Sequence, residues 1–291
     1  MENKLDNIKP FIKWVGGKRQ LLPEIIKYVP KTYSTYYEPF VGAGALFFEL
    51  MPRKAVINDL NKELIITYKS IKSDLSKLIS ELEKHERNNS KEYFYEVRNW
   101  DRLEDFNKKP NYEKAARLMY MNKVVYNGLY RVNSSGHFNV PYGKYKNPNI
   151  LDRTLLKNIS KYLKNSDIKI LSSNYLQAVK DVQKGDFVYF DPPYDPLNDT
   201  SSFTSYQKDG FNKQDQIDLK KCADQLVELG AKVILSNSNT EFINELYSNQ
   251  TKSAKAKENY YDIHLVDASR HINSNPNARG KIKEVLIVSK D

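Results

Sequence analysis

The segment Phe187-Val188-Tyr189-Phe190-Asp191-Pro192-Pro193-Tyr194 is an apolar run that ends in an acid, two prolines and an aromatic ring. The apolar run predicts a buried strand, and its end places the acid at the edge of a sheet. Proline fixes φ and lacks an N–H, so both prolines hold one backbone shape and leave carbonyls free to accept hydrogen bonds. A carboxylate, a carbonyl and an aromatic face together suit a flat ring that carries an amine. A strand that simply ends in a proline turn is equally compatible with this segment alone.

The surrounding sequence predicts an α/β fold for both ends of the chain. Residues 36–40 are strand-like and lead into Gly42-Ala43-Gly44 and an apolar helical run, and a second short strand ends at Asn58-Asp59. This order of strand, glycine turn, helix, strand and acid is the first half of a nucleotide-binding α/β unit. We therefore expect a Rossmann-like core with a mixed, mostly parallel sheet and helices on both faces. After residue 166 the expected strands are 168–171, 187–190, 233–235 and 285–288, and the expected helix is 214–229.

The middle third of the chain has a different character. Residues 64–165 contain 20 basic and 11 acidic side chains, and residues 120–165 contain 8 basic side chains against one acid. Charged helical patterns dominate here, and Ser134-Ser135-Gly136 predicts a hairpin turn. The expected organisation is one core, formed by residues 1–65 and 166–291, into which a basic module of residues 66–165 is inserted.

The composition favours an anionic partner and a reducing compartment. A formal net charge of +10 and a pI of about 9.2 place nucleic acid ahead of a membrane surface as that partner. Cys222 is the single cysteine, so no disulfide or cysteine-based zinc site is possible, which fits the cytoplasm. No signal peptide is visible, and no run reaches the roughly 18 apolar residues of a membrane span.

The segment 11–18 is a first candidate ligand contact. Gly16-Gly17 allows close backbone approach, Trp14 can cover an aromatic or cationic group, and Lys18 can neutralise a carboxylate. A glycine loop that opens a helix is the alternative interpretation of the same residues.

Gly42, Gly44 and Asp59 form a second candidate. The glycines depart from the dinucleotide fingerprint, because Phe47 stands where the third small residue belongs, and this disfavours an NAD enzyme. Asp59 follows the second strand, where an acid is placed for ribose hydroxyls. Helix capping is the alternative role for Asp59, although Asn58 and Asn61 could provide it as well.

Taken in order, these motifs resemble the DNA adenine N6-methyltransferases of the Dam type, the GATC-methylating D12 class or alpha group. The resemblance covers most of the chain and is weakest at about residues 66–115. Further stretches that carry it are Tyr126-Asn127-Gly128-Leu129-Tyr130-Arg131, Phe138-Asn139-Val140-Pro141-Tyr142-Gly143, Ser236-Asn237, Ser274-Asn275 and Arg279-Gly280-Lys281. It implies a methyltransferase core that uses S-adenosylmethionine, with residues 66–165 as an inserted helical and β-hairpin domain that recognises the DNA target.

The resemblance also implies a role for each matched residue. Residues that would bind S-adenosylmethionine are Trp14, Lys18, Phe40, Gly42, Gly44, Asp59 and Asp191. Residues that would form the catalytic site are Asp191, Pro192, Pro193 and Tyr194. Residues that would contact DNA are Tyr126, Asn127, Leu129, Arg131, Asn133, Pro141 and Lys144. No metal is required.

These roles imply a mechanism of base flipping and direct transfer. Asp191 and the Pro192 carbonyl would accept the two adenine N6 protons, while Tyr194 stacks on the flipped base. Methyl transfer would then be one in-line displacement that depends on positioning. Arg131 would contact guanine in the major groove, where bidentate Arg–guanine contacts are the commonest specific ones. Because Arg131 lies in the stretch most similar to GATC-methylating enzymes, a GATC-like site is expected, and related hairpins also serve longer sites that begin with GAT. Lys144 falls where relatives often carry Arg, and Lys lacks the bidentate fork.

Several alternatives stay open from the sequence. The same acceptors would serve N4 of cytosine or adenine in RNA, and a non-catalytic DNA-binding module is a third class. A cytosine C5 mechanism needs a reactive thiolate, whereas Cys222 follows Lys221 in a helical pattern and is expected to be buried. The expected partner is double-stranded DNA in a bacterial or phage cytoplasm, without membrane association. A cognate restriction endonuclease encoded alongside is compatible with the resemblance and is not physically required.

Overall fold

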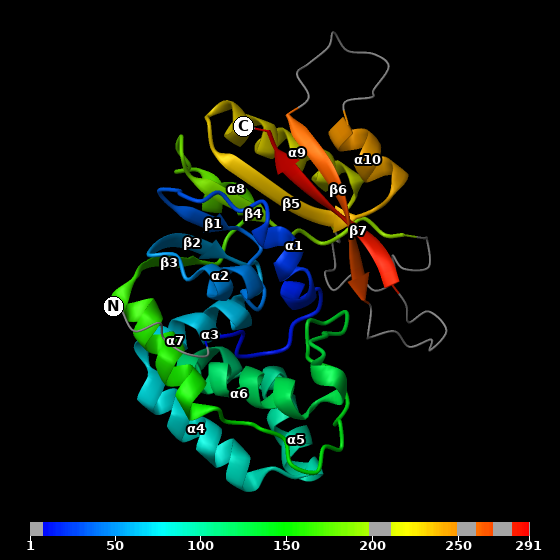
Figure 1. The fold of residues 1–291 in the computed structure, drawn as a ribbon. Helices are drawn as coiled ribbons and strands as arrows, with labels where there is room; N and C mark the ends of the chain where they lie inside the picture. The colour runs from blue at the N-terminus through cyan, green and yellow to red at the C-terminus, as the bar shows by residue number, and fades with distance from the viewer. Residues whose placement is uncertain (1–7, 198–210, 249–259, 270–280, 291) are drawn as a thin grey trace. The chain divides into compact units, whose positions relative to one another are not determined.

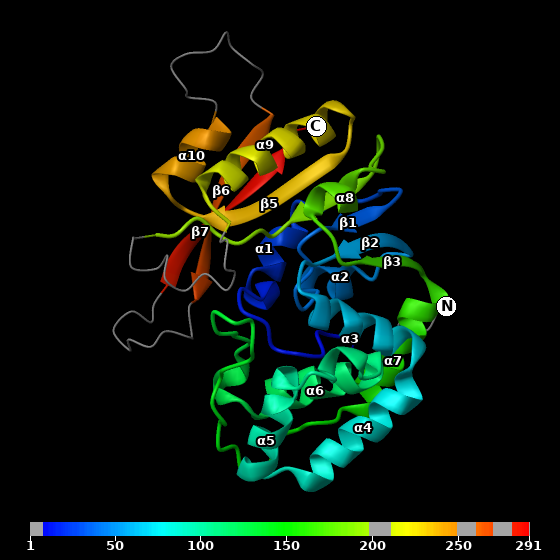
Figure 2. The ribbon, with the colours of Figure 1, turned by 180° about the vertical axis from the view of Figure 1, so that it is seen from behind.

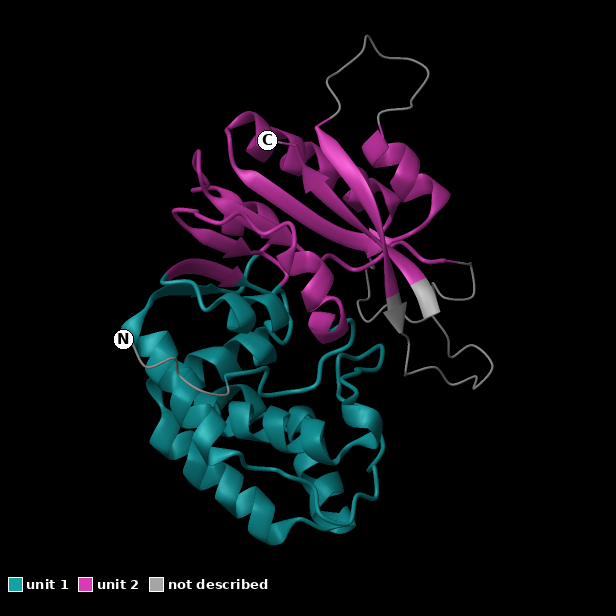
Figure 3. Cartoon of the chain, viewed as in Figure 1, with its two compact units in different colours: residues 1–17, 41–53, 58–173 teal, residues 18–40, 54–57, 174–291 magenta. Residues whose placement is uncertain are grey.

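The computed structural model describes residues 8–197, 211–248, 260–269 and 281–290 (Figure 1). The chain divides into two compact units, coloured in Figure 3. Unit 1 consists of residues 1–17, 41–53 and 58–173, and unit 2 consists of residues 18–40, 54–57 and 174–291.

The strands form one seven-stranded sheet in the order β3-β2-β1-β4-β5-β7-β6. Their bounds are β1 Tyr36–Glu38, β2 Lys54–Asn58, β3 Asp167–Leu171, β4 Phe187–Phe190, β5 Lys232–Ser238, β6 Tyr261–Ser269 and β7 Lys281–Ser289. β1 pairs in parallel with β2 and with β4, and β4 pairs in parallel with β5. β7 is antiparallel to both β5 and β6. The expected mixed, mostly parallel α/β sheet is therefore confirmed.

Helices of unit 2 cover the sheet. Their bounds are α1 Leu22–Ile26, α8 Tyr175–Val179, α9 Lys213–Glu228 and α10 Glu241–Ser248. α9 packs on β5 and α10 on β6, and Figure 2 shows both helices in front of these strands. All four residues of β4 are buried, as expected for a parallel strand between helical layers. This burial explains the unbroken apolar run before Asp191.

The sheet changes direction of winding between β1 and β4. β1 is followed by β2 on one side, while its other neighbour is β4. Ligands of open α/β sheets bind beyond the carboxyl ends of the strands at such a switch point. The residues after β1 and β4 are Pro39-Phe40 and Asp191, so the topology of unit 2 places both at a position typical of a ligand site.

Unit 1 is mostly helical. Its helices are α2 Ala45–Leu50, α3 Lys62–Ser73, α4 Leu75–Asn88, α5 Lys91–Arg98, α6 Asn111–Val124 and α7 Arg153–Asn165. α6 packs against α3, α4 and α5, and nine of its 14 residues are buried. Asn61 caps α3 by accepting a hydrogen bond from the Leu64 N–H at 3.0 Å, so the cap does not need Asp59.

The structure adds one strand that the sequence analysis missed. β6 pairs along its full length with β7, although only 285–288 was expected as a strand in this region. Apolar residues do alternate in its first part, at Tyr261, Ile263 and Leu265, which was the available signal. The division into a core and an inserted recognition module of residues 66–165 remains a prediction. Unit 1 also includes 1–17, 41–53 and other flanking residues.

Two further expectations concern the chain as a whole. Cys222 is buried as expected, and burial raises the pKa of its thiol to about 11, which opposes thiolate chemistry. Within the described ranges, no helix is both long and apolar enough to cross a membrane.

Candidate functional site

Asp191 lies directly after β4 and forms an ion pair with a lysine from the other candidate loop. Lys18 Nζ is 2.9 Å from Asp191 Oδ1, and the lysine side chain is only 7% exposed. The same Nζ lies 4.5 Å from the centre of the Tyr194 ring. Unit 2 therefore brings Lys18 next to Asp191 and Tyr194, although Lys18 lies 173 positions before Asp191 in the sequence.

Burial sets the protonation of Asp191. The pKa of its carboxyl is raised to about 6, mainly by burial and further by the Glu284 carboxylate, while Lys18 opposes the rise. Burial disfavours the charged form of an acid, and a neighbouring cation favours it. Asp191 is therefore ionised at neutral pH and can act as a hydrogen-bond acceptor.

Tyr194 is oriented through its hydroxyl group. The hydroxyl donates a hydrogen bond to Glu284 Oε2 at 2.9 Å. Glu284 lies on β7 opposite Ser238 of β5, which places it at the carboxyl end of the parallel strands. Burial, together with Asp191 and Glu284, holds the pKa of the Tyr194 hydroxyl well above its usual value, so it stays a neutral donor.

Buried amide side chains support the backbone at 191–195. Gln216 Nε2 donates to the Pro193 carbonyl at 2.9 Å, and Gln216 Oε1 accepts from Asn237 Nδ2 at 3.0 Å. Asn237 Oδ1 in turn accepts from the Asp195 N–H at 3.0 Å. Within the described residues, no donor is recorded for the Pro192 carbonyl, whereas the Pro193 carbonyl is occupied by Gln216.

Phe40 follows β1 and belongs to an aromatic group in unit 2. Its ring centre is 5.5 Å from that of Tyr175, 6.3 Å from Phe190 and 6.0 Å from Phe211. These distances are typical of stabilising aromatic pairs. The group provides flat apolar surface near the carboxyl ends of β1 and β4.

The glycine loop of unit 1 is built for close approach. Gly42 and Gly44 have φ of 49° and 72°, in the left-handed region that favours glycine. A Cβ on Gly42 would lie 3.0 Å from Trp14 Cδ1, and one on Gly44 would lie 2.6 Å from the Tyr68 hydroxyl oxygen. Larger residues would therefore push away the indole and the phenol that line this loop.

Asp59 ties the loop together. Its Oδ2 accepts from the Gly42 N–H at 3.0 Å and its Oδ1 accepts from the Asn61 N–H at 2.9 Å. Burial raises the pKa of the Asp59 carboxyl, and these two N–H donors oppose the rise. A carboxylate has about four acceptor positions, so roughly two remain for hydroxyl groups of a ligand.

Trp14 stacks on Tyr130, at 5.1 Å between ring centres and 29° between planes. Tyr130 directly precedes Arg131, the expected guanine contact. Unit 1 thus joins an expected cofactor residue to the start of the expected recognition hairpin.

The hairpin around Ser134-Ser135-Gly136 is formed as expected. Val132 and Phe138 form an antiparallel bridge, and the Gly136 N–H donates to the Asn133 carbonyl at 2.9 Å. Asn133 Oδ1 accepts from the N–H groups of Ser135 and His137, so this oxygen serves the turn itself.

Arg131 is exposed, and one of its nitrogens is fixed. Its Nε donates to Asn139 Oδ1 at 2.7 Å, while its terminal nitrogens find no acceptor in the described part of the chain. The guanidinium therefore presents its two-pronged end outward.

The other expected DNA contacts lie in loops of unit 1. Tyr126 is 53% exposed, and Pro141 and Lys144 are exposed, whereas Asn127 and Leu129 are half-buried. Asn127 and Lys144 both have φ of 55°, which is uncommon for residues with a Cβ. The Tyr126 N–H donates to the Pro141 carbonyl at 3.1 Å, so the two loops are joined.

The described residues say little about two further expectations, the tail stretch and the lack of a metal. The tail stretch from Ser274-Asn275 to Arg279-Gly280 lies outside the described residues. Among the residues that the structure describes, no group of three or more His, Cys, Asp or Glu side chains could hold a metal ion.

Sequence reasoning missed the residues that support the site. Glu284, Gln216 and Asp195 were not singled out, and Asn237 appeared only within a matched stretch. Glu284 gave little signal in the sequence, because it lies between Lys283 and the apolar run 285–288, where a charged residue is ordinary.

Comparisons with known proteins agree on one family. The profile of the D12 class N6 adenine-specific DNA methyltransferase family matches residues 14–272. The chain is 49% identical to the Type II methyltransferase M1.LlaDCHI of Lactococcus lactis subsp. cremoris, over 99% of this chain and 97% of the relative. It is 43% identical to the Type II methyltransferase M.MjaIII of Methanocaldococcus jannaschii, over 97% and 99%. It is 32% identical to the DNA adenine methylase of Escherichia coli strain K12, over 97% and 95%.

Proposed function

The chain belongs to the D12 class of N6 adenine-specific DNA methyltransferases, and from this premise we propose that it methylates adenine within GATC sites of duplex DNA after flipping the base out of the helix. Transfer of a methyl group to N6 of adenine in DNA is the activity of the family. The target sequence, the base flipping and the role of each residue are the proposal.

The main observation that supports this proposal is the arrangement of hydrogen-bond acceptors at Asp191. N6 of adenine has two protons, and unit 2 offers the Asp191 carboxylate and, next to it in the chain, the Pro192 carbonyl, which has no described donor. Accepting both protons draws electron density toward N6 and makes it more nucleophilic. An adenine inside a duplex cannot reach such acceptors, so the base has to swing out at a cost of a few kcal/mol.

Stacking offsets part of that cost. The Tyr194 ring is held by its hydrogen bond to Glu284, and base–aromatic stacking is worth about 1–3 kcal/mol. We therefore assign Asp191, Pro192, Pro193 and Tyr194 to the catalytic site. Pro193 acts by holding the backbone, since its carbonyl is already bonded to Gln216.

Membership in a methyltransferase family implies S-adenosylmethionine, and the residues present fit this cofactor. Asp59 retains acceptor capacity for ribose hydroxyls, and the glycines at 42 and 44 let Trp14 and Tyr68 pack closely against the loop that Asp59 holds. Trp14 and Phe40 offer aromatic faces, and Lys18 a cation. When bound, S-adenosylmethionine supplies an electrophilic methyl group on a positively charged sulfur. We assign these residues, with Asp191, to cofactor binding.

Recognition is assigned to residues 66–165. Arg131 has its Nε fixed on Asn139 and its fork open, which suits the bidentate contact to guanine O6 and N7. Tyr126, Asn127, Leu129, Asn133, Pro141 and Lys144 are assigned to the surrounding DNA contacts. Lys144 would act as a point charge on a phosphate rather than as a base reader. The cytoplasm is the proposed location, and a restriction endonuclease encoded alongside is a proposed functional partner.

Mapping of modified bases tests the function directly. The protein is incubated with labelled S-adenosylmethionine and plasmid DNA, and the modified positions are sequenced. Label in N6-methyladenine at GATC supports the proposal. Label in N4-methylcytosine, or in RNA in preference to duplex DNA, contradicts it.

The Arg131 assignment has its own test. Arg131→Ala should reduce discrimination against sites with a changed guanine by about 1–3 kcal/mol, or roughly 5–150-fold. An even loss of affinity across all sequences would make Arg131 a phosphate contact instead.

A further inference from the structure

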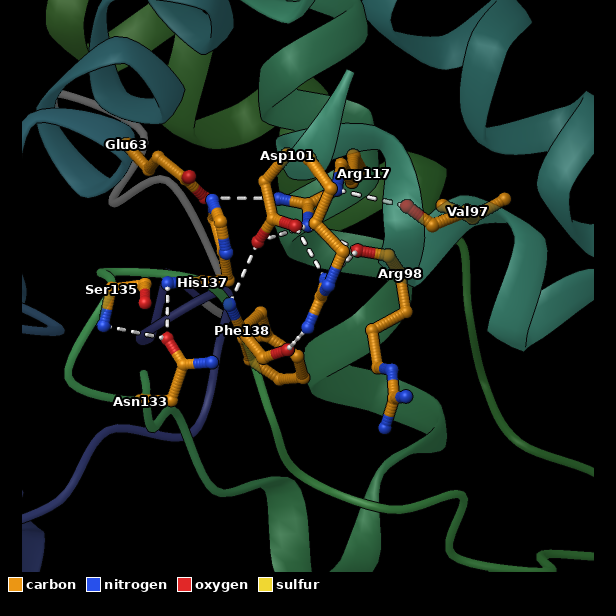
Figure 4. Close-up of polar contacts among 10 residues, drawn as sticks. Glu63, Val97, Arg98, Asp101, Arg117, Asn133, Ser135, His137 and Phe138 are labelled. Carbon is orange, nitrogen blue, oxygen red and sulfur yellow. Dashed lines mark hydrogen bonds and ion pairs between the residues drawn. The ribbon is translucent and has the colours of Figure 1, made fainter.

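Arg117 on α6 is a charged side chain with no solvent exposure. Its Nη2 lies 2.9 Å from Asp101 Oδ2, and its Nη1 lies 3.5 Å from Glu63 Oε2. Its Nε donates to the Val97 carbonyl at 3.0 Å, and its Nη2 donates to the Arg98 carbonyl at 2.8 Å. A buried guanidinium needs such partners, because taking a charge out of water costs several kcal/mol. Figure 4 shows these contacts converging on Arg117 and Asp101.

Asp101 connects this buried cation to the recognition hairpin. Its Oδ2 accepts a hydrogen bond from the Phe138 N–H at 2.7 Å, and its Oδ1 pairs with Arg102 Nη1 at 2.6 Å. Arg102 Nη2 then donates to the Phe138 carbonyl at 3.0 Å. Two neighbouring side chains thus hold both backbone polar groups of one hairpin residue.

Phe138 is the point at which the hairpin can be held. It is the bridge partner of Val132, and the next residue, Asn139, donates its N–H to the Arg131 carbonyl at 3.0 Å. Asn139 also fixes Arg131 Nε through its side chain. A shift of Phe138 would therefore move both the backbone and the guanidinium of Arg131.

The hairpin needs an external support. It consists of an isolated bridge and a turn rather than a ladder of strand hydrogen bonds, and a lone two-stranded hairpin is at best marginally stable in water. The Phe138 side chain supplies apolar anchoring, since it is buried and packs edge-on against Tyr130 at 5.7 Å. Apolar packing fixes position less strictly than paired hydrogen bonds with defined directions, which Asp101 and Arg102 add.

We propose that Asp101 and Arg102 are positioning residues that set the site specificity of the enzyme by clamping the backbone of Phe138, with Arg117 fixing Asp101 from the core. The inference rests on the proposed role of Arg131 in target recognition. It assigns specificity to residues that lie 29 and 30 positions before Arg131 in the sequence and do not need to touch a base.

Two variants test the clamp. Asp101→Ala removes three contacts, to the Phe138 N–H, Arg102 and Arg117. Arg102→Ala removes only the contacts of Arg102 to Asp101 and to the Phe138 carbonyl, and it is the safer variant for folding, because the Arg102 side chain is 31% exposed. Arg153→Ala is the matched control, since it removes an exposed ion pair with Glu83 in the same unit, away from the hairpin.

The first measurement is amide hydrogen exchange of the free protein. Exchange at Phe138 should be about ten-fold or more faster in Asp101→Ala and in Arg102→Ala than in the wild type. Amides of the α6 interior should be unchanged in Arg102→Ala, and Arg153→Ala should match the wild type throughout. This measurement needs neither DNA nor activity, so it remains valid if the proposed function fails.

The second measurement compares methylation rates on a GATC duplex and on duplexes with one changed base pair. In Arg102→Ala the ratio of kcat/KM values should fall by about ten-fold, while KM for S-adenosylmethionine stays constant. Arg102→Lys, which can still donate to the Phe138 carbonyl, should recover part of the ratio. The proposal is overturned if Phe138 exchange is unchanged, if exchange rises while discrimination is intact, or if affinity falls evenly for all sequences.

Discussion

The loop after β4 and the hairpin of residues 131–139 are held in place by different kinds of contact. Neutral buried amides, Gln216 and Asn237, hold the backbone after Asp191. Charged side chains, Asp101 and Arg102, hold the hairpin. The difference follows from what each loop carries. Asp191 has a pKa that responds to every nearby charge, so neutral supports leave its titration to Lys18 and Glu284. The hairpin carries a residue whose charge does not change, and ion pairs can hold it without altering its chemistry.

The largest effect is expected from Asp191→Ala. Loss of the carboxylate acceptor should lower the rate of methyl transfer by about 10³-fold, comparable to removal of a key polar group in other active sites. Transfer of label from S-adenosylmethionine to a GATC duplex measures this, with DNA affinity as the control. Turnover close to that of the wild type would show that Asp191 takes no part in the chemistry. The neutral supports after β4 could then not be explained by the titration of Asp191.

The next effect is expected from Arg117→Met, which tests the charged support. Two carboxylates, Asp101 and Glu63, would lose their buried cation, so the free energy of unfolding should fall by about 3–5 kcal/mol. Urea denaturation measures the change, and Arg153→Ala, which breaks an exposed pair, should cost less than about 1 kcal/mol. Equal losses of unfolding free energy in the two variants would show that the buried ion pairs of Arg117 stabilise the fold no more than an exposed ion pair does.

A smaller effect is expected from Gln216→Met, which tests the neutral support. The Pro193 carbonyl and the Asn237 amide would each lose a partner, at a cost of about 1–3 kcal/mol. The rate kcat should fall while KM for DNA changes little, because the loop that carries Asp191 loosens. Gln214→Met on the same helix is the control, since that side chain is exposed and, within the described part of the chain, its recorded bond is to Asp218. Identical kinetics in the two variants would contradict a supporting role for Gln216.

The smallest effect concerns pH. Asp191 is a stronger hydrogen-bond acceptor when ionised, and protonation turns one of its oxygens into a donor, so kcat/KM should fall as the pH drops below about 6, the pKa to which burial raises its carboxyl. Glu284→Gln removes a like charge and should lower that pKa, shifting the acidic limb of the profile downward by up to about one unit. The Tyr194 hydroxyl can still donate to the new amide oxygen. A profile that does not move would mean that the Glu284 charge is not felt at Asp191.

Local patterns sufficed for the parts of the site that are contiguous in sequence. The strand before Asp191, the glycine turn at 42–44, the Asn61 cap and the turn at 134–136 were all visible, because periodicity and turn chemistry act over a few residues. The methyltransferase family followed from the order of these motifs.

The supporting residues could not be predicted in the same way. Gln216 contacts a residue 23 positions away, and Asp101 contacts one 37 positions away. Neither has a local signature, since an amide in an amphipathic helix and an acid after a helix are both ordinary on a surface. Arg117 gave a weak signal, as a cation among apolar neighbours in α6, but its partners depend on how three separate segments pack.

Asp59 has a thermodynamic consequence beyond its candidate contact with a ligand. Because its two oxygens fasten the Gly42 and Asn61 amides, the turn between β1 and α2 has its shape before anything binds. The conformational entropy of that turn is lost during folding, so ordering the turn does not oppose the binding of a ligand. Calorimetry on Asp59→Asn should then show weaker binding of S-adenosylmethionine with a more unfavourable entropy, as the loosened turn becomes ordered only when the ligand arrives.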